Sequence, residues 1–233
     1  ITPEDRLKPG DGFLFHRGYS LASIGWQWDA FGEGALTLRA PEARIDNHPL
    51  RGSVMVEFRP DADLPALPLL QPGQEKLSYP ILDTLAATSR LQVKAHEDDL
   101  AQILPSSHWR FTQMDGGQPT PGETHILVDG GFEKGKIYQL VYTTEGAPVV
   151  GTGLLAIRDI ATFLRNKGDL NPLASGFERV YGFGVSQTGR ALRHFLYVGL
   201  NRDEEERIAY DGLFIHIAGG QRGDFNHRFA QPS

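Results

Sequence analysis

The stretch "VYGFGVSQTGRALRHFLYVG" (180–199) places a single serine between two segments of different character. The apolar run before Ser186 is typical of a buried strand, and the residues after Gly189 carry apolar side chains at helical spacing. Gly184 and Gly189 supply the small residues that a turn needs where a strand and a helix approach each other closely. The stretch predicts a strand, a sharp turn that carries Ser186, and a helix.

The segments around this turn predict a parallel sheet. Apolar side chains recur on one face of 153–166, which predicts an amphipathic helix. The run 19–28 has no helical stripe and predicts a buried strand near the start of the chain. Strands at 19–28, 179–185 and 212–218 that alternate with helices imply a parallel α/β sheet with right-handed crossovers.

Between residues 30 and 150 the pattern changes to short β-type runs separated by proline and glycine. These runs lie at 35–39, 53–58, 90–95, 124–128 and 136–144. Such punctuation is typical of antiparallel strands joined by turns. The prediction is an α/β core made of residues 1–29 and 151–233, with a β-rich insertion over 30–150.

The composition is that of an ordinary globular protein and argues against several classes of function. The 233 residues carry a formal net charge of -6 and include no cysteine, so neither a nucleic-acid partner nor thiol chemistry is expected. No apolar run approaches the ~20 residues that span a bilayer, so no membrane partner is expected. The chain begins with Ile1, which predicts a processed product or a fragment and slightly favours a secreted or periplasmic location.

The position of Ser186 suits a nucleophile. A serine hydroxyl must be presented to a base and to a substrate carbonyl, and a sharp turn between strand and helix exposes it in this way. The amide of Gln187, at the start of the helix, is expected to stabilise the developing oxyanion. The spacing differs from G-x-S-x-G, because Thr188 occupies the place of the second glycine. The alternative is a glycine-rich turn whose serine caps the helix.

Five stretches resemble one bacterial family of α/β-hydrolase-domain proteins and together span essentially the whole chain. They read "GDGFLFHRGYSLASIGWQWD", "LTLRAPEAR", "GGFEKGKIYQLVYTTEGAPVVGTGLLAIRD", "GFGVSQTGRALRHFLY" and "HIAGGQRGDFNHRFAQPS". The resemblance implies the α/β-hydrolase fold, with Ser186 as nucleophile on the nucleophile elbow. "GVSQTGR" is more distantly similar to the same turn of glucuronoyl esterases, which implies that Arg190 contacts the substrate at the place of a residue that binds a sugar acid.

Members of this family are longer at both ends. The resemblance therefore implies that the chain is a fragment, whose fold is completed by the remaining segments of the same protein or by another chain. Those segments would supply further strands and, in the usual order of serine, acid and histidine, the catalytic histidine. We expect the fragment alone to be inactive in that case, and to expose apolar surface and unpaired strand edges.

Four residues within the chain are considered for the rest of a catalytic triad. His216, near the end of the strand predicted beside the serine strand, is the candidate base, with a satisfied core histidine as the alternative. His227 and Asp224 follow that strand, where the alternative is a surface loop held by hydrogen bonds. His194 lies on the helix after the serine and is expected to be a packing or surface residue.

Trp26 and Asp29 lie at the end of the first predicted strand, at the edge where ligands bind in open α/β sheets. We expect Trp26 to line a substrate pocket and Asp29 to orient it, with a core tryptophan as the alternative. The acidic stretch 96–99 lacks paired histidines and predicts a solvated turn, so no metal site is expected.

Together these observations predict a serine hydrolase that cleaves a small-molecule carboxylic ester without a cofactor. Ser186 would attack the carbonyl, the Gln187 amide would bind the oxyanion, and a histidine, His216 if it lies in this chain, would act as general base. The alternative is a non-catalytic binding protein that retains the hydrolase fold and binds through its β-rich insertion.

Overall fold

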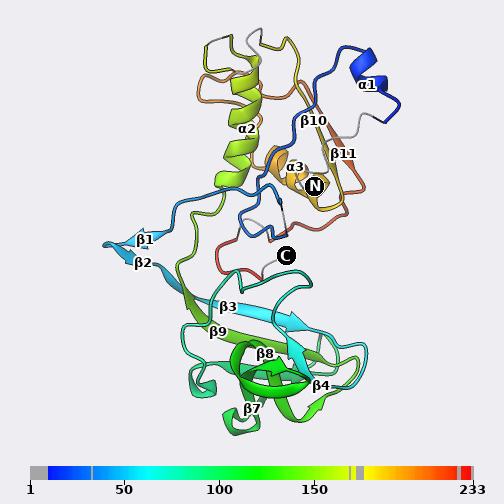
Figure 1. Ribbon diagram of the computed structural model, residues 1–233. Helices are drawn as coiled ribbons and strands as arrows, with labels where there is room; N and C mark the ends of the chain where they lie inside the picture. Colours follow the sequence, from blue (N-terminus) through cyan, green and yellow to red (C-terminus); the bar gives the residue numbers. More distant parts are fainter. Residues whose placement is uncertain (1–9, 33, 168, 172–175, 225–226, 232–233) are drawn as a thin grey trace. The chain divides into compact units, whose positions relative to one another are not determined.

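The computed structural model describes residues 10–32, 34–167, 169–171, 176–224 and 227–231. Contacts divide the chain into two compact units, and Figure 1 labels their elements. The first, called here the α/β unit, comprises Ile1–Ala40 and Val150–His227. The second, called here the β unit, comprises Pro41–Val149 and Arg228–Ser233.

One sheet of the β unit has antiparallel strands in the order β3-β9-β5-β6, and Figure 1 labels β3 and β9 of this sheet. Their bounds are Arg51–Phe58 (β3), Ile137–Glu145 (β9), Arg90–Lys94 (β5) and Gln102–Leu104 (β6). Buried and less buried side chains alternate along β3 and β9, because successive residues of a strand point to opposite faces. Val54, Leu91 and Leu140 are completely buried and belong to the core on the inner face of this sheet.

A second antiparallel sheet has the order β4-β8-β7. It consists of Leu64–Pro68 (β4), Gln118–Phe132 (β8) and Trp109–Asp115 (β7), with register shifts in both pairings of β8. The unit also contains a hairpin and two short 3-10 helices, with bounds Arg44–Ile45 (β1), His48–Pro49 (β2), Ala86–Thr88 (η1) and Ser106–His108 (η2). The strands predicted at 53–58, 90–95, 124–128 and 136–144 are confirmed as parts of β3, β5, β8 and β9.

Residues near the C-terminus pack onto the β unit through an aromatic contact. The Phe229 ring lies over Gly52, where an added Cβ atom would come within 2.1 Å of the ring. The Phe229 N–H donates to the Tyr79 hydroxyl at 3.0 Å, and the two rings lie 5.7 Å apart. Tyr79 is fixed in turn, because its carbonyl accepts a hydrogen bond from the Tyr142 hydroxyl at 2.9 Å. The absence of a side chain at Gly52 is what allows Phe229 to dock.

The described part of the α/β unit contains three helices and one pair of parallel strands. Their bounds are Phe13–His16 (α1), Thr152–Arg165 (α2), Tyr181–Val185 (β10), Gln187–Tyr197 (α3) and Gly212–His216 (β11). The strands β10 and β11 pair in parallel, with Val185 opposite His216 at the end of the register. The predicted helix at 153–166, the two strands on either side of the serine helix, and that helix itself are confirmed.

The helices α2 and α3 form the core of this unit together with one face of the strand pair. Seven buried residues make up what we call the core cluster: Leu154, Ile157, Ala161, Leu192, Phe195, Ala209 and Tyr210. Leu213 and Ile215 of β11 pack against it. Within the cluster, the rings of Phe195 and Tyr210 meet edge to face with centroids 5.9 Å apart. The strand pair therefore presents one face to the helices.

Two strand predictions are wrong: residues 19–28 and 35–39 form no strand. The two segments approach each other instead, and the Leu38 N–H donates to the Gln27 carbonyl at 3.0 Å. This backbone contact runs to residue 38 and not to a parallel neighbour, which would have formed a ladder of evenly spaced bonds.

The same segment also packs on helix α2. A Cβ atom at Gly153, in the first turn of α2, would lie 2.0 Å from the Trp26 carbonyl oxygen. The Trp26 side chain packs against the core cluster. This segment packs on the helices and does not join a sheet. Among the described residues, β10 and β11 are the only parallel strands, so the larger parallel sheet that we predicted is not seen there.

Asp211 holds the starts of both parallel strands. Its carboxylate accepts a hydrogen bond from the Val180 N–H at 2.7 Å and forms an ion pair with Arg165 of α2. The Asp211 N–H donates to the Val180 carbonyl at 2.9 Å. The bond from the Val180 N–H, followed by that from Arg165, lowers the pKa of Asp211 below its ordinary value.

We expect this carboxylate to make the stability of the α/β unit depend on acid pH. Because the pKa is lower in the folded state, the stabilisation is present above the unfolded pKa of about 3.9 and is lost as the pH falls through the folded value. Urea unfolding between about pH 3 and 6 should therefore show a smaller loss of stability on acidification for Asp211→Asn than for the wild type. Equal slopes for the two proteins would contradict the prediction.

Candidate active site

Ser186 connects β10 to α3 in a backbone conformation that residues other than glycine rarely adopt. Its φ is 54° and its ψ is -115°, and it is the N-terminal cap residue of α3. Such conformations cost about 1–3 kcal/mol and persist where the surrounding structure holds them. The sharp turn predicted at this serine is present, and its backbone is strained.

Hydrogen bonds on both sides of Ser186 hold this conformation. The Ser186 N–H donates to the carbonyl of His216 in β11 at 3.0 Å, and the Ser186 carbonyl accepts from the Arg190 N–H at 2.9 Å. The Thr188 hydroxyl lies 2.8 Å from the nitrogen and 2.8 Å from the oxygen of Val185, the residue before the serine. The turn is thus tied to the neighbouring strand, to the following helix and to itself.

The two flanking glycines let α3 come close to both β10 and β11. A Cβ atom at Gly184 would lie 2.6 Å from the Thr188 carbonyl oxygen and 2.8 Å from the Gly189 nitrogen. A Cβ atom at Gly189 would lie 2.9 Å from the His216 carbonyl oxygen. These neighbours are backbone atoms that cannot rotate away, so the glycine spacing in the sequence has a steric cause.

The Ser186 side chain does not cap the helix. It is exposed and makes no capping hydrogen bond to α3, so the helix-capping alternative is wrong. Among the described residues, the hydroxyl has no hydrogen bond to a histidine. Gln187 is the first residue of α3, and N–H groups in the first turn of a helix point toward its positive N-terminal end.

His216 lies next to Ser186 through its main chain. Its carbonyl accepts the Ser186 N–H, whereas its imidazole stacks on the Phe214 ring with centroids 6.0 Å apart and planes at 16°. The side chain is exposed, so the alternative of a buried core histidine is wrong. The structure thus places the candidate base at the correct end of the neighbouring strand, with its ring directed along the outer face of the strand pair.

That outer face carries exposed aromatic residues that the sequence reasoning missed. Tyr181, Phe183 and Phe214 are 51%, 69% and 62% exposed, and the two phenylalanine rings stack with centroids 5.5 Å apart. On the opposite face of β10 lies Gly182, where an added Cβ atom would meet Leu213 and Tyr210 at the core. The alternation Y-G-F-G-V in β10 was the available signal, because aromatic residues and glycines then lie on opposite faces.

Each of the three residues predicted to bind substrate contacts another part of the protein. The Arg190 Nε donates to the Ala218 carbonyl, just beyond β11, at 3.3 Å. Trp26 is half-buried and packs against the core cluster. Asp29 accepts a hydrogen bond from the Gln27 amide at 2.7 Å.

The loop after β11 lies along α3. The Arg222 guanidinium stacks over the Tyr197 ring at 4.1 Å, and the His227 N–H donates to the Asp224 carbonyl at 2.8 Å. Burial lowers the pKa of His194, and the charges of Arg222 and His227 lower it further. Asp224 and His227 are exposed and joined by this backbone hydrogen bond, and the two residues between them lie outside the described residues.

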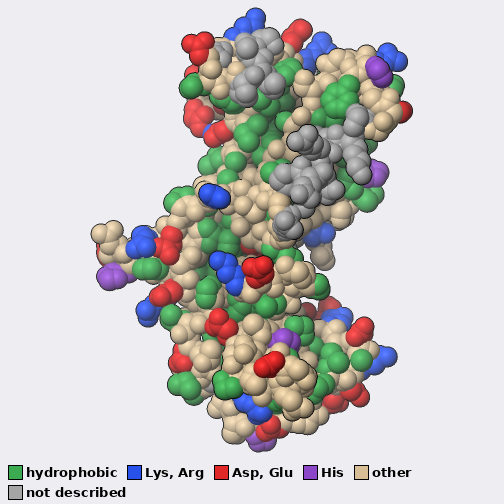
Figure 2. Space-filling view, in the orientation of Figure 1, with side chains coloured by type: hydrophobic (Ala, Val, Ile, Leu, Met, Phe, Trp, Pro, Cys, Tyr) green, Lys and Arg blue, Asp and Glu red, His purple; other side chains and the backbone are tan. Residues whose placement is uncertain are grey.

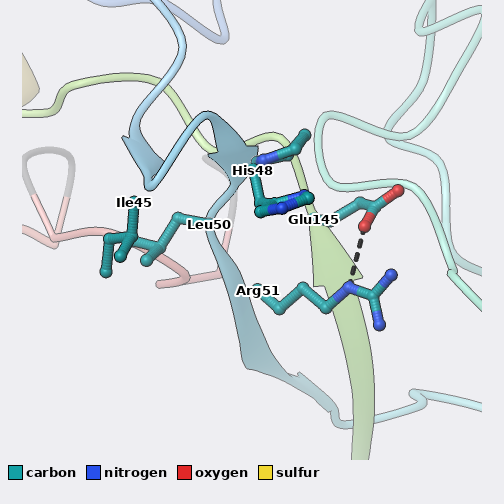
Figure 3. A pocket seen from close by; sticks show the side chains of 6 residues that line it. Ile45, His48, Leu50, Arg51 and Glu145 are labelled. Atoms are coloured by element: carbon teal, nitrogen blue, oxygen red, sulfur yellow. Dashed lines mark hydrogen bonds and ion pairs between the residues drawn. The ribbon is translucent and has the colours of Figure 1, made fainter.

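Two surface hollows lie in the β unit, and neither borders Ser186. One, of about 360 Å³, adjoins the β1–β2 hairpin, where the Arg51 Nε donates to Glu145 at 2.9 Å (Figure 3). The other, of about 410 Å³, is lined by Asp63, Leu64, Pro65, Leu127, Val128, Gly130, Gly131 and Phe132. Both hollows are open to solvent, and the residues that line them do not include Ser186 or its neighbours in the turn.

The surface chemistry of the described residues is mixed. Figure 2 shows lysine and arginine side chains interspersed with aspartate and glutamate on the visible face. Within the described ranges, no group of three His, Cys, Asp or Glu side chains could hold a metal ion. None of the helices described is both long and apolar enough to cross a membrane.

Comparison with known proteins identifies one family. Residues 131–233 match a family described as an alpha/beta hydrolase domain, and the matched segment includes α2, β10, Ser186, α3 and β11. The comparisons with curated proteins and with solved structures gave no match. The resemblance to α/β-hydrolase-domain proteins seen in the sequence is thus confirmed over residues 131–233, the part of the chain that matches this family.

Proposed function

We propose that the protein is a serine hydrolase that cleaves a carboxylic ester, with Ser186 as its nucleophile. The family match supports a hydrolase in general. The observation that carries the serine mechanism is the strained backbone of Ser186 at the N-terminus of α3, with an exposed side chain that does not cap the helix. A strained backbone that the surrounding structure holds in place is typical of a functional position.

The proposed reaction proceeds in two steps. The Ser186 hydroxyl oxygen attacks the ester carbonyl carbon while a general base accepts the hydroxyl proton, and the Gln187 N–H donates to the resulting oxyanion. The tetrahedral species then expels the alcohol, which takes the proton from the base, and the acyl group stays on Ser186. Water activated by the same base releases the acid and restores the serine.

The proposed base is His216 or a histidine from a segment outside residues 1–233. His216 ends the strand that bonds the Ser186 N–H, so its backbone is already fixed beside the turn. Its ring must leave the stack on Phe214 to reach the hydroxyl. Arg190 is the proposed substrate contact, because it lies one helical turn after Ser186 and its guanidinium carries further donors besides Nε.

Labelling with a fluorophosphonate probe tests the serine mechanism, because this reagent reacts covalently with activated serines. We expect the folded wild-type protein to take up the label at Ser186, as located by mass spectrometry of the labelled peptide, and Ser186→Ala to abolish labelling. The matched control is Ser20→Ala, which changes an exposed serine of the same unit and should leave labelling unchanged.

Two outcomes separate the alternatives. Loss of labelling in His216→Ala assigns the base to this chain, whereas unchanged labelling in that variant assigns it elsewhere. An intact, folded wild-type protein, with any segments outside residues 1–233 present, that takes up no label contradicts the serine mechanism and favours a non-catalytic binding protein that retains the hydrolase fold.

A further inference from the structure

We propose that Thr188 is a positioning residue that holds Ser186 in its reactive conformation; this role rests on the proposed serine hydrolase function. Thr188 stands where the pattern G-x-S-x-G has its second glycine, so a side chain replaces a hydrogen atom at this turn. Its hydroxyl is within hydrogen-bond distance of two backbone atoms of the residue that precedes the serine.

Both hydrogen bonds of Thr188 fall on Val185. The Val185 N–H donates to the Thr188 hydroxyl at 2.8 Å, and the same hydroxyl donates to the Val185 carbonyl at 2.8 Å. Successive peptide groups of a strand point to opposite sides, and the Ser186 N–H points to β11. The N–H and carbonyl groups of Val185 therefore point to the edge of β10 that faces away from β11. There the Thr188 hydroxyl forms the hydrogen bonds that a neighbouring strand would otherwise form.

This bridge fixes the backbone immediately before the strained residue. The φ of Ser186 is the rotation about its N–Cα bond, measured from the Val185 carbonyl carbon, so an immobile Val185 carbonyl group fixes one end of this dihedral angle. The bond from the Ser186 N–H to His216 restrains the same peptide group from the opposite edge of β10. With the Arg190 N–H bound to the Ser186 carbonyl, the strained residue is held from both sides.

The side-chain chemistry required at position 188 is narrow. The group must accept a hydrogen bond from an N–H and donate one to a carbonyl of the same residue, which a hydroxyl does and an alkyl group does not. Serine keeps both bonds, whereas valine has nearly the shape of threonine and keeps neither. Thr188→Ser and Thr188→Val therefore separate the two hydrogen bonds from the volume of the side chain.

The experiment measures reaction at Ser186 in these two variants and in a matched control. The control is Thr162→Val, because the Thr162 hydroxyl also donates to a backbone carbonyl, that of Arg158 in α2, at 3.2 Å. We would determine the rate constant of fluorophosphonate labelling, and kcat and KM for p-nitrophenyl acetate, in the full chain. Thermal unfolding of each variant, followed by circular dichroism, measures how much the substitution lowers the stability of the fold, independently of the reaction at Ser186.

For Thr188→Val we expect labelling and kcat to fall on the order of 10²-fold, as for a displaced reacting group, with KM within about twofold of the wild type. Thr188→Ser should restore both rates, and Thr162→Val should leave them unchanged despite a similar loss of thermal stability. Wild-type rates in Thr188→Val would overturn the positioning role, as would equal losses in Thr188→Val and Thr162→Val.

Two further results complete the test. If Thr188→Val does not fold, hydrogen exchange of the Val185 amide in the wild type decides, because the proposed bond requires protection at an amide on a strand edge. Exchange at the rate of an unstructured amide would overturn the proposal. An intact wild-type protein that is folded but takes up no label refutes the serine hydrolase function itself. Labelling that is present but unaffected by substitution at position 188 refutes only the role of Thr188.

Discussion

Replacing Gly184 with alanine is expected to abolish labelling of Ser186 and to lower the free energy of unfolding of the α/β unit by about 3 kcal/mol, the upper end of the usual cost of overpacking. The added Cβ atom would lie 2.6 Å from the Thr188 carbonyl oxygen and 2.7 Å from the Thr188 carbonyl carbon. Both atoms belong to the first turn of α3, so the helix can avoid the clash only by moving away from β10 and carrying the turn with it.

The matched control for this prediction is Gly182→Ala, two residues earlier in the same strand. The Cβ atom at Gly182 would lie 2.4 Å from the Leu213 Cδ2, which is the end of a flexible side chain. That side chain can rotate, so we expect a loss of about 1 kcal/mol and retention of labelling. Equal effects of the two substitutions would show that the close approach of β10 and α3 is not what the turn requires.

Replacing Phe195 with alanine is expected to lower the free energy of unfolding of the α/β unit by about 3–5 kcal/mol. The Phe195 side chain is completely buried, lies in the core cluster and meets the Tyr210 ring edge to face. Its removal leaves a cavity between α3 and α2, and rigid secondary structure on both sides limits how far the site can collapse.

Tryptophan fluorescence can follow this unit alone. Trp26 and Trp28 lie in the α/β unit and Trp109 in the β unit, so a Trp109→Phe background reports the α/β unit during urea unfolding. Trp26 packs against the core cluster and senses its loss directly. The control is Phe163→Ala on α2, because Phe163 is 40% exposed and should cost much less. Similar losses for the two phenylalanines would contradict the assignment of the core.

The turn at Ser186 could be predicted from sequence because its causes are local. Gly184 and Gly189 are required where strand and helix touch, and those contacts fall mostly within six residues of the chain. The helices α2 and α3 were predictable for a similar reason, since an apolar stripe at helical spacing lies on each. The β-rich character of 53–144 followed from short runs between turn residues.

The environment of the candidate site was decided by contacts between distant segments. The run 19–28 has the apolar composition of a buried strand, yet it bonds near residue 38 and packs on α2. Composition shows that a segment is buried but not which partner buries it, because helices and strands offer apolar surface alike. The same limit applies to Trp26, which is half-buried and packs against the core cluster.

By itself, the sequence determined that a serine lies on a sharp turn between a strand and a helix, because steric fit and hydrogen bonding act there over a few residues. Only the tertiary structure decided that the His216 carbonyl holds this serine while the His216 ring stacks on Phe214. Hydrogen bonds of this kind depend on distances of a few tenths of an ångström and on the register between β10 and β11, which is fixed when the two strands pack against the helices.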